Sequence, residues 1–221
     1  MFLHTHPYDP YIFPDTKRLI VGTLPPPRFT GGKLNEQDVD FCYGSRNGLL
    51  WRVWDEIYDL NLVYENTHHA IEQRKAFLKR ERIGICDIVG AAYRDKVDAS
   101  DLGMKKVVLR DLLDILGKHP NVDSLIFTGG NSKNGPEYFF RQLLKKQGLS
   151  LLCVDDQVPR KHQLECAGRT IITFSLTAPS GTANRAIGSM QEYKTNKAND
   201  PQYTPFDFRV AQYGKVFKNL S

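Results

Sequence analysis

The sequence predicts an α/β fold: a three-layer αβα sandwich with a mostly parallel central sheet. Short apolar runs alternate along the chain with amphipathic runs of about ten residues or more, which is typical of strands connected by helices. The apolar runs are nearly continuous, as in strands that are buried on both faces of a sheet. The chain has 221 residues, of which 41% are hydrophobic, enough for one substantial core. We therefore expect a single domain over residues 1–221.

The first predicted strand lies at residues 19–21 and ends at Gly22, which three prolines follow after two residues. Proline cannot donate a hydrogen bond to a sheet, so the chain must continue as a stiff loop. Residues 28–40 are polar and predict a surface loop. A helix is predicted after Asn47, because apolar residues then recur at helical spacing. They are Leu50, Val53, Trp54 and Ile57.

Two further helices and one strand are predicted in the middle of the chain. Residues 70–84 form a charged helical segment that is expected to end at Gly84. The short apolar run at residues 83–92 is consistent with a buried strand. Another amphipathic helix is expected to close at Gly117 and Pro120. Its apolar side is marked by Leu109, Leu112, Leu113 and Leu116.

The second half of the chain continues the alternation. A strand near residues 122–128 ends in two glycines, and a helix over residues 136–148 has Pro136 in its first turn. Strands are expected at residues 150–154 and within residues 169–181. Residues 206–220 predict a last helix.

Composition restricts the function classes. The net charge is +5 and the sequence pI is about 8.9, which suits a polyanionic partner but is also common without one. The four cysteines form no CxxC pair, so no zinc or iron–sulfur site is indicated, and we expect reduced, mostly buried thiols. The sequence shows no signal peptide and no apolar run of about 18 residues. We expect a cytoplasmic protein without a membrane partner.

Three predicted strands end in loops that combine Gly or Pro with Ser, Thr or Asn, at residues 21–29, 127–135 and 175–188. In open α/β sheets, ligands bind at the carboxyl ends of the strands, where such loops gather. None of the loops matches the P-loop or the GxGxxG pattern. Nucleotide hydrolysis and dinucleotide binding are therefore disfavoured.

The segments "LIVGTLPPPRF" and "CYGSRNGLLWRVWDEI" resemble the first two signature segments of the uracil-DNA glycosylase superfamily. The closest branch is the hypoxanthine (deoxyinosine) DNA glycosylases, whose pattern is roughly strand-GSFPS, a loop, and YY-x-HPRN-x-FW. The resemblance continues through "GICDIVGAAYRDKVDASD", "VDSLIFTGGNS" and "FSLTAPSGTANRAI", over roughly residues 17–190. It implies a monofunctional DNA glycosylase that needs no metal or cofactor and acts as a monomer on DNA containing a damaged base.

The resemblance gives Asn47 the branch's catalytic asparagine position. An amide both donates and accepts, so it can orient a water or contact the base. The alternative is a helix N-cap, where Asn is among the preferred residues. Tyr43, or else Phe41, would stack on the flipped base, and the alternative for either is core packing.

The base pocket that the resemblance implies contains Gly22, Thr23, Leu24, Thr128 and Asn131. Two of these depart from the superfamily's usual pattern. The first motif offers only Thr23 where many relatives carry a water-positioning acid or amide, and Thr128 stands where relatives carry a base-reading asparagine. Because a threonine cannot make the paired contacts of an amide, the identity of the target base stays open.

The third loop resembles the superfamily's minor-groove loop, which implies that Ser180, Gly181, Asn184 and Arg185 contact DNA, with Arg46 as a further phosphate ligand. Asp87 follows a predicted strand, either as a functional carboxylate or as a cap on the following turn, and we favour the cap.

Two other functions stay open. The protein could be a catalytically inactive nucleic-acid-binding member of the same fold, or a small-molecule hydrolase that uses the same loops. The second lacks a G-x-S-x-G elbow, and His119 and His162 lie in polar, surface-like sequence contexts.

Overall fold

The computed structural model describes residues 1–218 and is built around a six-stranded sheet. Its strand order is β3-β2-β6-β9-β8-β7. Neighbouring strands pair in parallel from β3 to β9, whereas β8 pairs antiparallel with both β9 and β7, so the sheet is mostly parallel, as the sequence predicts. In spatial order the strands are β3 (Ile83–Ile85), β2 (Arg18–Val21), β6 (Ser124–Phe127), β9 (Arg169–Ser175), β8 (Arg160–Cys166) and β7 (Leu152–Asp155).

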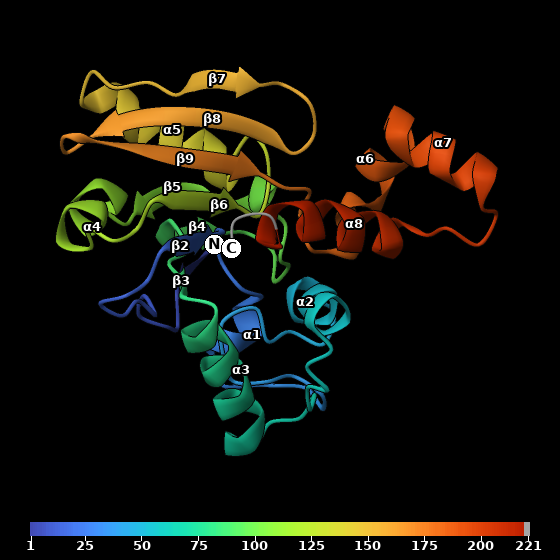
Figure 1. Cartoon of the computed structure of the whole chain (residues 1–221). Coiled ribbons are helices and arrows are strands. Elements are labelled where there is room, and N and C mark those ends of the chain that lie inside the picture. The colour runs from blue at the N-terminus through green and yellow to red at the C-terminus, as the bar shows by residue number, and fades with distance from the viewer. Residues whose placement is uncertain (219–221) are drawn as a thin grey trace.

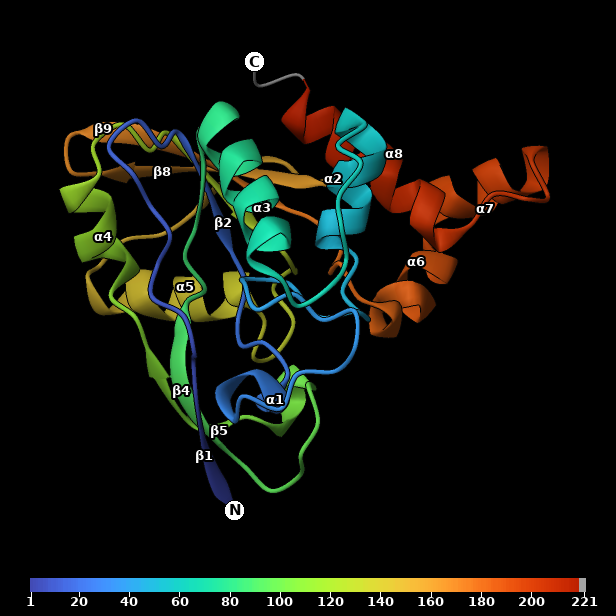
Figure 2. The same cartoon turned by 90° about the horizontal axis from the view of Figure 1, so that it is seen from below.

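Helices cover both faces of this sheet, which confirms the three-layer prediction (Figures 1 and 2). One face packs against α2 (Leu50–Tyr58), α3 (His68–Arg80) and α8 (Pro205–Phe217). The other packs against α4 (Leu112–Lys118) and α5 (Pro136–Lys146). A small antiparallel sheet of β1 (Phe2–Thr5), β4 (Val89–Arg94) and β5 (Lys105–Leu109) adjoins this second layer.

Successive residues of the central strands enter opposite cores. Ile20 and Ile126 belong to the cluster under α2, α3 and α8, whereas Leu19 and Leu125 belong to the cluster under α4 and α5. This alternation follows from the two-residue period of a strand. It explains why the strands are apolar without interruption.

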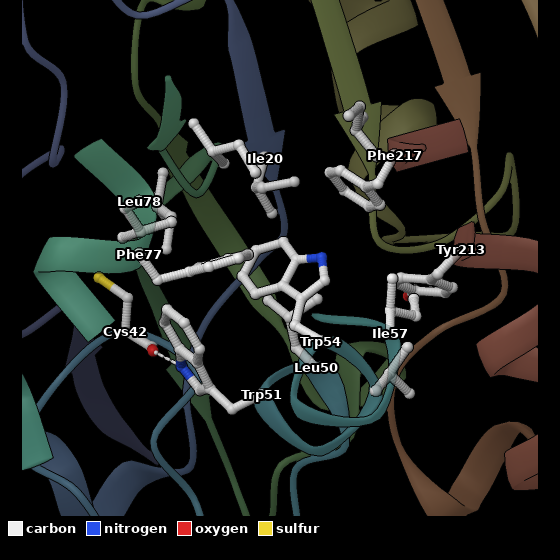
Figure 3. Close-up of a cluster of buried hydrophobic side chains, with 14 of the residues drawn as sticks. Ile20, Cys42, Leu50, Trp51, Trp54, Ile57, Phe77, Leu78, Tyr213 and Phe217 are labelled. Atoms are coloured by element: carbon white, nitrogen blue, oxygen red, sulfur yellow. Dashed lines mark hydrogen bonds between the residues drawn. The ribbon is translucent and has the colours of Figure 1, made fainter. Parts of the chain in front are cut away.

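The larger cluster is rich in aromatic side chains (Figure 3). Trp51 and Trp54 are fully buried and meet edge to face, with their ring centroids 5.0 Å apart. The indole N–H of Trp51 donates to the carbonyl of Cys42 at 2.8 Å. Without this bond, the only polar group of the buried Trp51 side chain would have no partner. The same bond attaches the irregular segment before α2 to the core.

Several predicted boundaries are wrong, and close packing explains the one at Gly84. The helix predicted to end at Gly84 is α3, which ends at Arg80, and Gly84 lies inside β3. A Cβ at Gly84 would come within 2.9 Å of Thr16 Cγ2, so glycine is needed there for close packing rather than as a helix end. Leu109 belongs to β5, and Gly117 lies inside α4.

Other differences concern elements that the sequence does not predict. The run at residues 83–92 contains two strands, β3 and β4, and the predicted loop at 28–40 overlaps a short helix, α1 (Pro27–Thr30). The sequence does not predict strand β8, because polar residues dominate it and only two of its side chains are buried. The thiols are free but not mostly buried, since Cys153 is exposed and Cys166 is half-buried.

The chain between β9 and α8 contains two unpredicted helices, α6 (Asn184–Ser189) and α7 (Gln191–Asn199), which project from the body in both views (Figures 1 and 2). None of the α7 side chains is buried. The last predicted helix is confirmed as α8, while its predicted extension over residues 219–220 lies outside the described residues. Within residues 1–218, no helix is both long and apolar enough to cross a membrane.

Candidate functional site

The three strand-end loops singled out in the sequence meet at one edge of the sheet. Val21 at the end of β2 pairs with Phe127 at the end of β6, and Phe127 pairs with Ser175 at the end of β9. Parallel pairing therefore brings the loops that follow these strands together, which is where ligands bind in such sheets.

Asp87 forms the polar centre of this edge. It lies just beyond β3 and is only 6% exposed. Its Oδ1 accepts from the Gly22 amide at 2.9 Å and from the Tyr43 hydroxyl at 2.7 Å, and its Oδ2 lies 2.9 Å from His6 Nε2. The predicted cap on the following turn is therefore wrong, because the carboxylate joins three other segments of the chain.

The hydrogen bonds of His6 identify its tautomer. Its Nδ1 accepts from the backbone N–H of Tyr8 at 3.1 Å, so the proton of the neutral ring lies on Nε2. Nε2–H then donates to Asp87. Sequence reasoning missed His6, because no motif links the start of the chain to Asp87, 81 residues away.

Tyr43, Gly22 and Thr128 surround the other side of the carboxylate. The Tyr43 hydroxyl lies 3.2 Å from Thr128 Oγ1, and burial raises the pKa of Tyr43 well above its ordinary value, so the phenol stays a donor. A Cβ at Gly22 would lie 2.1 Å from this hydroxyl. Only glycine fits there. Tyr43 itself adopts a left-handed backbone with φ of 59°, a strained conformation that is concentrated at functional sites.

A second polar group adjoins the first through Thr23, whose hydroxyl donates to Oδ1 of Asp101 at 2.6 Å. Asp101 begins a short 3-10 helix, η1 (Asp101–Gly103), between β4 and β5. Burial raises the pKa of Asp101 to about 6. Sequence reasoning did not single out Asp101, although it is the last residue of the segment "GICDIVGAAYRDKVDASD", which carries part of the resemblance.

The loop after β6 contributes Asn134 in addition to the predicted Asn131. Asn134 is buried and donates to the backbone carbonyls of Asp101 at 2.9 Å and Met104 at 3.2 Å. Asn131 is exposed. Leu24 is expected to line the pocket with backbone groups, and its side chain is 8% exposed and packs in the core.

Asn47 lies in a tight turn before α2 and not at its N-cap. The Gly48 amide donates to the Ser45 carbonyl at 2.7 Å, and Leu49 is the cap residue. The Asn47 side chain is exposed and makes no hydrogen bond to any residue from 1 to 218. The N-cap alternative is therefore wrong, and the amide is free to contact a ligand. Phe41 is buried in the core, with its ring edge-on to that of Tyr11.

The turn that carries Asn47 is joined directly to the third loop. Gly48 and Ser180 form an isolated antiparallel bridge, and the Leu49 amide donates to the Pro179 carbonyl at 2.8 Å. Residues far apart in the sequence are thus neighbours at this edge. The structure brings together the segment predicted for catalysis and the segment predicted for DNA contact.

Helix α8 holds the third loop in place. Buried Arg209 donates to the carbonyls of Ala178 at 3.0 Å and Ser180 at 2.6 Å. The Tyr213 hydroxyl donates to the Thr177 carbonyl at 2.8 Å, and Gln212 accepts from the Thr177 amide and hydroxyl. The apolar pattern of α8 did not reveal these contacts, because they come from polar residues on its buried side.

The predicted DNA-contacting residues lie in or next to the two segments that the Gly48–Ser180 bridge joins. Asp38 fixes the loop before Arg46, because it accepts from the Arg46 amide at 2.8 Å and from Arg28 through two bonds of 2.7 Å. The side chain of Arg46 is left exposed. Gly181, Asn184 and Arg185 are also exposed, and Ser180 is half-buried.

Other candidate chemistry receives less support. The part of the chain that the structure describes contains no group of three or more metal-binding side chains. His162, expected near the surface, is buried and lies 3.0 Å from Arg141 through Nε2. Two surface hollows contain none of the predicted site residues. One lies beside α2, and the other lies at the amino ends of β2, β6 and β9.

Comparisons with known proteins support the fold. No protein-family model matches the chain, and no curated protein matches it. Among solved structures, a solution NMR structure of a "putative Uracil DNA glycosylase" from Methanosarcina acetivorans is similar, with a TM-score of 0.58 and 18% sequence identity over 99% of both chains. This similarity establishes a uracil-DNA-glycosylase-like α/β fold.

Proposed function

We propose that this protein is a monofunctional DNA glycosylase that removes a deaminated base, hypoxanthine or uracil, by hydrolysis of the N-glycosidic bond. The observation that supports this most strongly is the bridge between Gly48 and Ser180. It unites the free amide of Asn47 with the loop that resembles a DNA-binding loop, beside strand ends lined by Thr23 and Thr128. The similar fold of the archaeal protein adds support.

The chemistry requires the base to leave the helical stack, which costs a few kcal/mol, and then to depart from a sugar that passes through an oxocarbenium-like state. Asn47 suits this task because its amide offers a donor and an acceptor without ionising. Its side chain is exposed and engaged by no described residue. In this proposal Asn47 contacts the departing base, and the ring of Tyr43 flanks it.

DNA is bound by the exposed residues around the site. Arg46 and Arg185 supply charges for phosphates, which position DNA without reading sequence, while Ser180, Gly181 and Asn184 supply polar groups from the third loop. Arg209 and Tyr213 keep that loop in a fixed conformation from behind. The enzyme would act as a monomer in the cytoplasm on nucleoid DNA.

The direct test is release of the base from labelled oligonucleotides that carry one deoxyinosine, deoxyuridine or deoxyxanthosine, detected by alkaline cleavage. The wild-type protein should cleave at least one of them. Asn47→Ala should lower the single-turnover rate by about 10²-fold or more, with unchanged stability. Asn199→Ala, an exposed asparagine at the end of α7, is the matched control. Release by Asn47→Ala at the wild-type rate would exclude the asparagine mechanism.

One observation favours a second candidate, a DNA-binding protein without glycosylase activity. The Tyr43 hydroxyl occupies the space next to Gly22. The loops converge there, and the proposed base pocket would need that space. Salt-sensitive binding to DNA without a product from any lesion would support this candidate.

A further inference from the structure

We propose that Thr23 and Asp101 together hold and activate the water that attacks the sugar, with Asp101 as the general base. This inference rests on the proposed glycosylase function and adds a catalytic acid to it. Thr23 occupies the first-motif position at which the sequence offers no acid, and the structure supplies a carboxylate there from a different segment.

The hydrogen bond between the two residues determines what each can do. The Thr23 hydroxyl donates its only proton to Asp101 at 2.6 Å, so its oxygen faces other groups as an acceptor. Oδ2 of Asp101 makes no hydrogen bond to any described residue, and the side chain keeps partial exposure to solvent. A water at this position would meet two acceptors, the Thr23 oxygen and the free carboxylate oxygen.

The backbone around Asp101 is fixed independently of its carboxylate. Its carbonyl accepts from the Asn134 side chain at 2.9 Å and from the Met104 amide at 3.0 Å. Thr23 directly follows Gly22, whose amide binds Asp87. The pair therefore lies next to the polar centre at the strand ends, on a rigid support.

Burial and the charges that face Asp101 bring the pKa of its carboxyl group into the range suited to proton transfer near neutral pH. Burial is the main cause that raises its pKa to about 6, and the negative charge of Asp87 acts in the same direction. The Thr23 hydrogen bond and the Arg94 guanidinium from β4 oppose the shift. A base with a pKa near the working pH is the most effective one for this kind of catalysis.

The bond between C1′ and the base nitrogen breaks, and its electron pair leaves with the base, which takes a proton from solvent. The water oxygen bonds to C1′, and the proton that it loses passes to Asp101 and then to solvent. The products are the free base and an abasic sugar.

The test compares single-turnover rates against pH, on whichever lesion the wild-type protein cleaves. The wild-type rate should rise with pH through about 6, because the base must be ionised. Asp101→Asn keeps the backbone contacts and the acceptor for Thr23, and it should lower the rate about 10²-fold and abolish the rise near pH 6. Asp95→Asn, an exposed aspartate paired with Lys105, should retain the wild-type profile.

Thr23 variants separate positioning from folding. Thr23→Val should lower the rate, Thr23→Ser should restore most of it, and both should bind an uncleavable 2′-fluorinated lesion oligonucleotide as the wild type does. If the wild-type protein releases no base, the proposed function fails and this inference fails with it. If the wild-type protein is active and Asp101→Asn keeps its rate and pH profile, only this inference is overturned.

Discussion

His6 Nε2 lies 2.9 Å from Asp87 Oδ2. Because His6 directly follows β1, this bond connects β1 to the centre of the candidate site. Because Nδ1 of His6 already accepts from the Tyr8 amide, the ring can act only as a donor to Asp87. The carboxylate in turn accepts from two further donors, the Gly22 amide and the Tyr43 hydroxyl. Three parts of the chain thus depend on one acceptor.

The first prediction is that Asp87→Asn destabilises the protein although it hardly changes the side chain's size. The new amide group would face a donor whichever way it turns, since neither the His6 ring nor the Gly22 amide can become an acceptor. An unsatisfied buried donor costs about 1–3 kcal/mol. We expect the free energy of unfolding, measured by urea denaturation, to fall by about that amount. Asp95→Asn, on the surface, should change it by less than about 0.5 kcal/mol. Equal stability of both variants would contradict the central role of Asp87.

The hydrogen bonds around Asp87 could not be predicted from the sequence, whereas the layers of the fold could. The layers follow from apolar patterning, which is strong in strands such as β2 and β6, whose side chains are all buried. The convergence of the loops follows from parallel pairing. The links between distant segments, such as His6 with Asp87 and Thr23 with Asp101, depend on tertiary geometry that no local pattern encodes. Asn47 illustrates the difference, because its residue type equally suits a cap, and only the position of the helix start excludes one.

The second prediction concerns the space at Gly22. A Cβ there would lie 2.1 Å from the Tyr43 hydroxyl and 2.7 Å from Asp87 Oδ1, so Gly22→Ala must displace the tyrosine from the carboxylate. We expect a loss of about 1–3 kcal/mol in the free energy of unfolding, together with loss of base release. Gly181→Ala, where no atom lies within 4 Å of the new Cβ, is the control for stability. A crystal structure of Gly22→Ala with the Tyr43–Asp87 bond intact would contradict the prediction.

The third prediction is that Arg209 positions the third loop, which we propose binds DNA. Its guanidinium donates to the carbonyls of Ala178, Ser180 and Pro205, a spread that a single ammonium group cannot reproduce. Arg209→Lys should therefore lower the free energy of unfolding by about 1–3 kcal/mol, because carbonyls lose their donors. It should also weaken DNA binding, although Arg209 itself is fully buried.

The control for Arg209 is Arg185→Lys, which changes an exposed arginine of the same region. It should leave stability within about 0.5 kcal/mol of wild type, and it keeps the charge that phosphates attract. Measurement of DNA affinity at two salt concentrations separates the effects, because loss of a direct phosphate contact would reduce the salt dependence. If Arg209→Lys binds DNA as the wild type does, the loop does not depend on α8.

The fourth prediction is a loss of stability in acid that originates at His4. This histidine is 1% exposed and its Nδ1 accepts from Arg94 Nε at 2.9 Å, so a proton there would remove the acceptor and place two cations together. Burial, with Arg94, lowers the pKa of His4 to about 4, whereas the unfolded chain has the ordinary value of about 6.5. Between these values the unfolded state binds more protons, so stability falls as the pH drops from about 6.5 towards 4. Between pH 7 and pH 5 the free energy of unfolding should fall by about 2 kcal/mol from this residue.

His4→Gln should remove most of that dependence in urea titrations at the two pH values, while His68→Gln, an exposed histidine near Glu72, should leave it in place. An unchanged pH dependence in His4→Gln would assign the acid sensitivity to other groups.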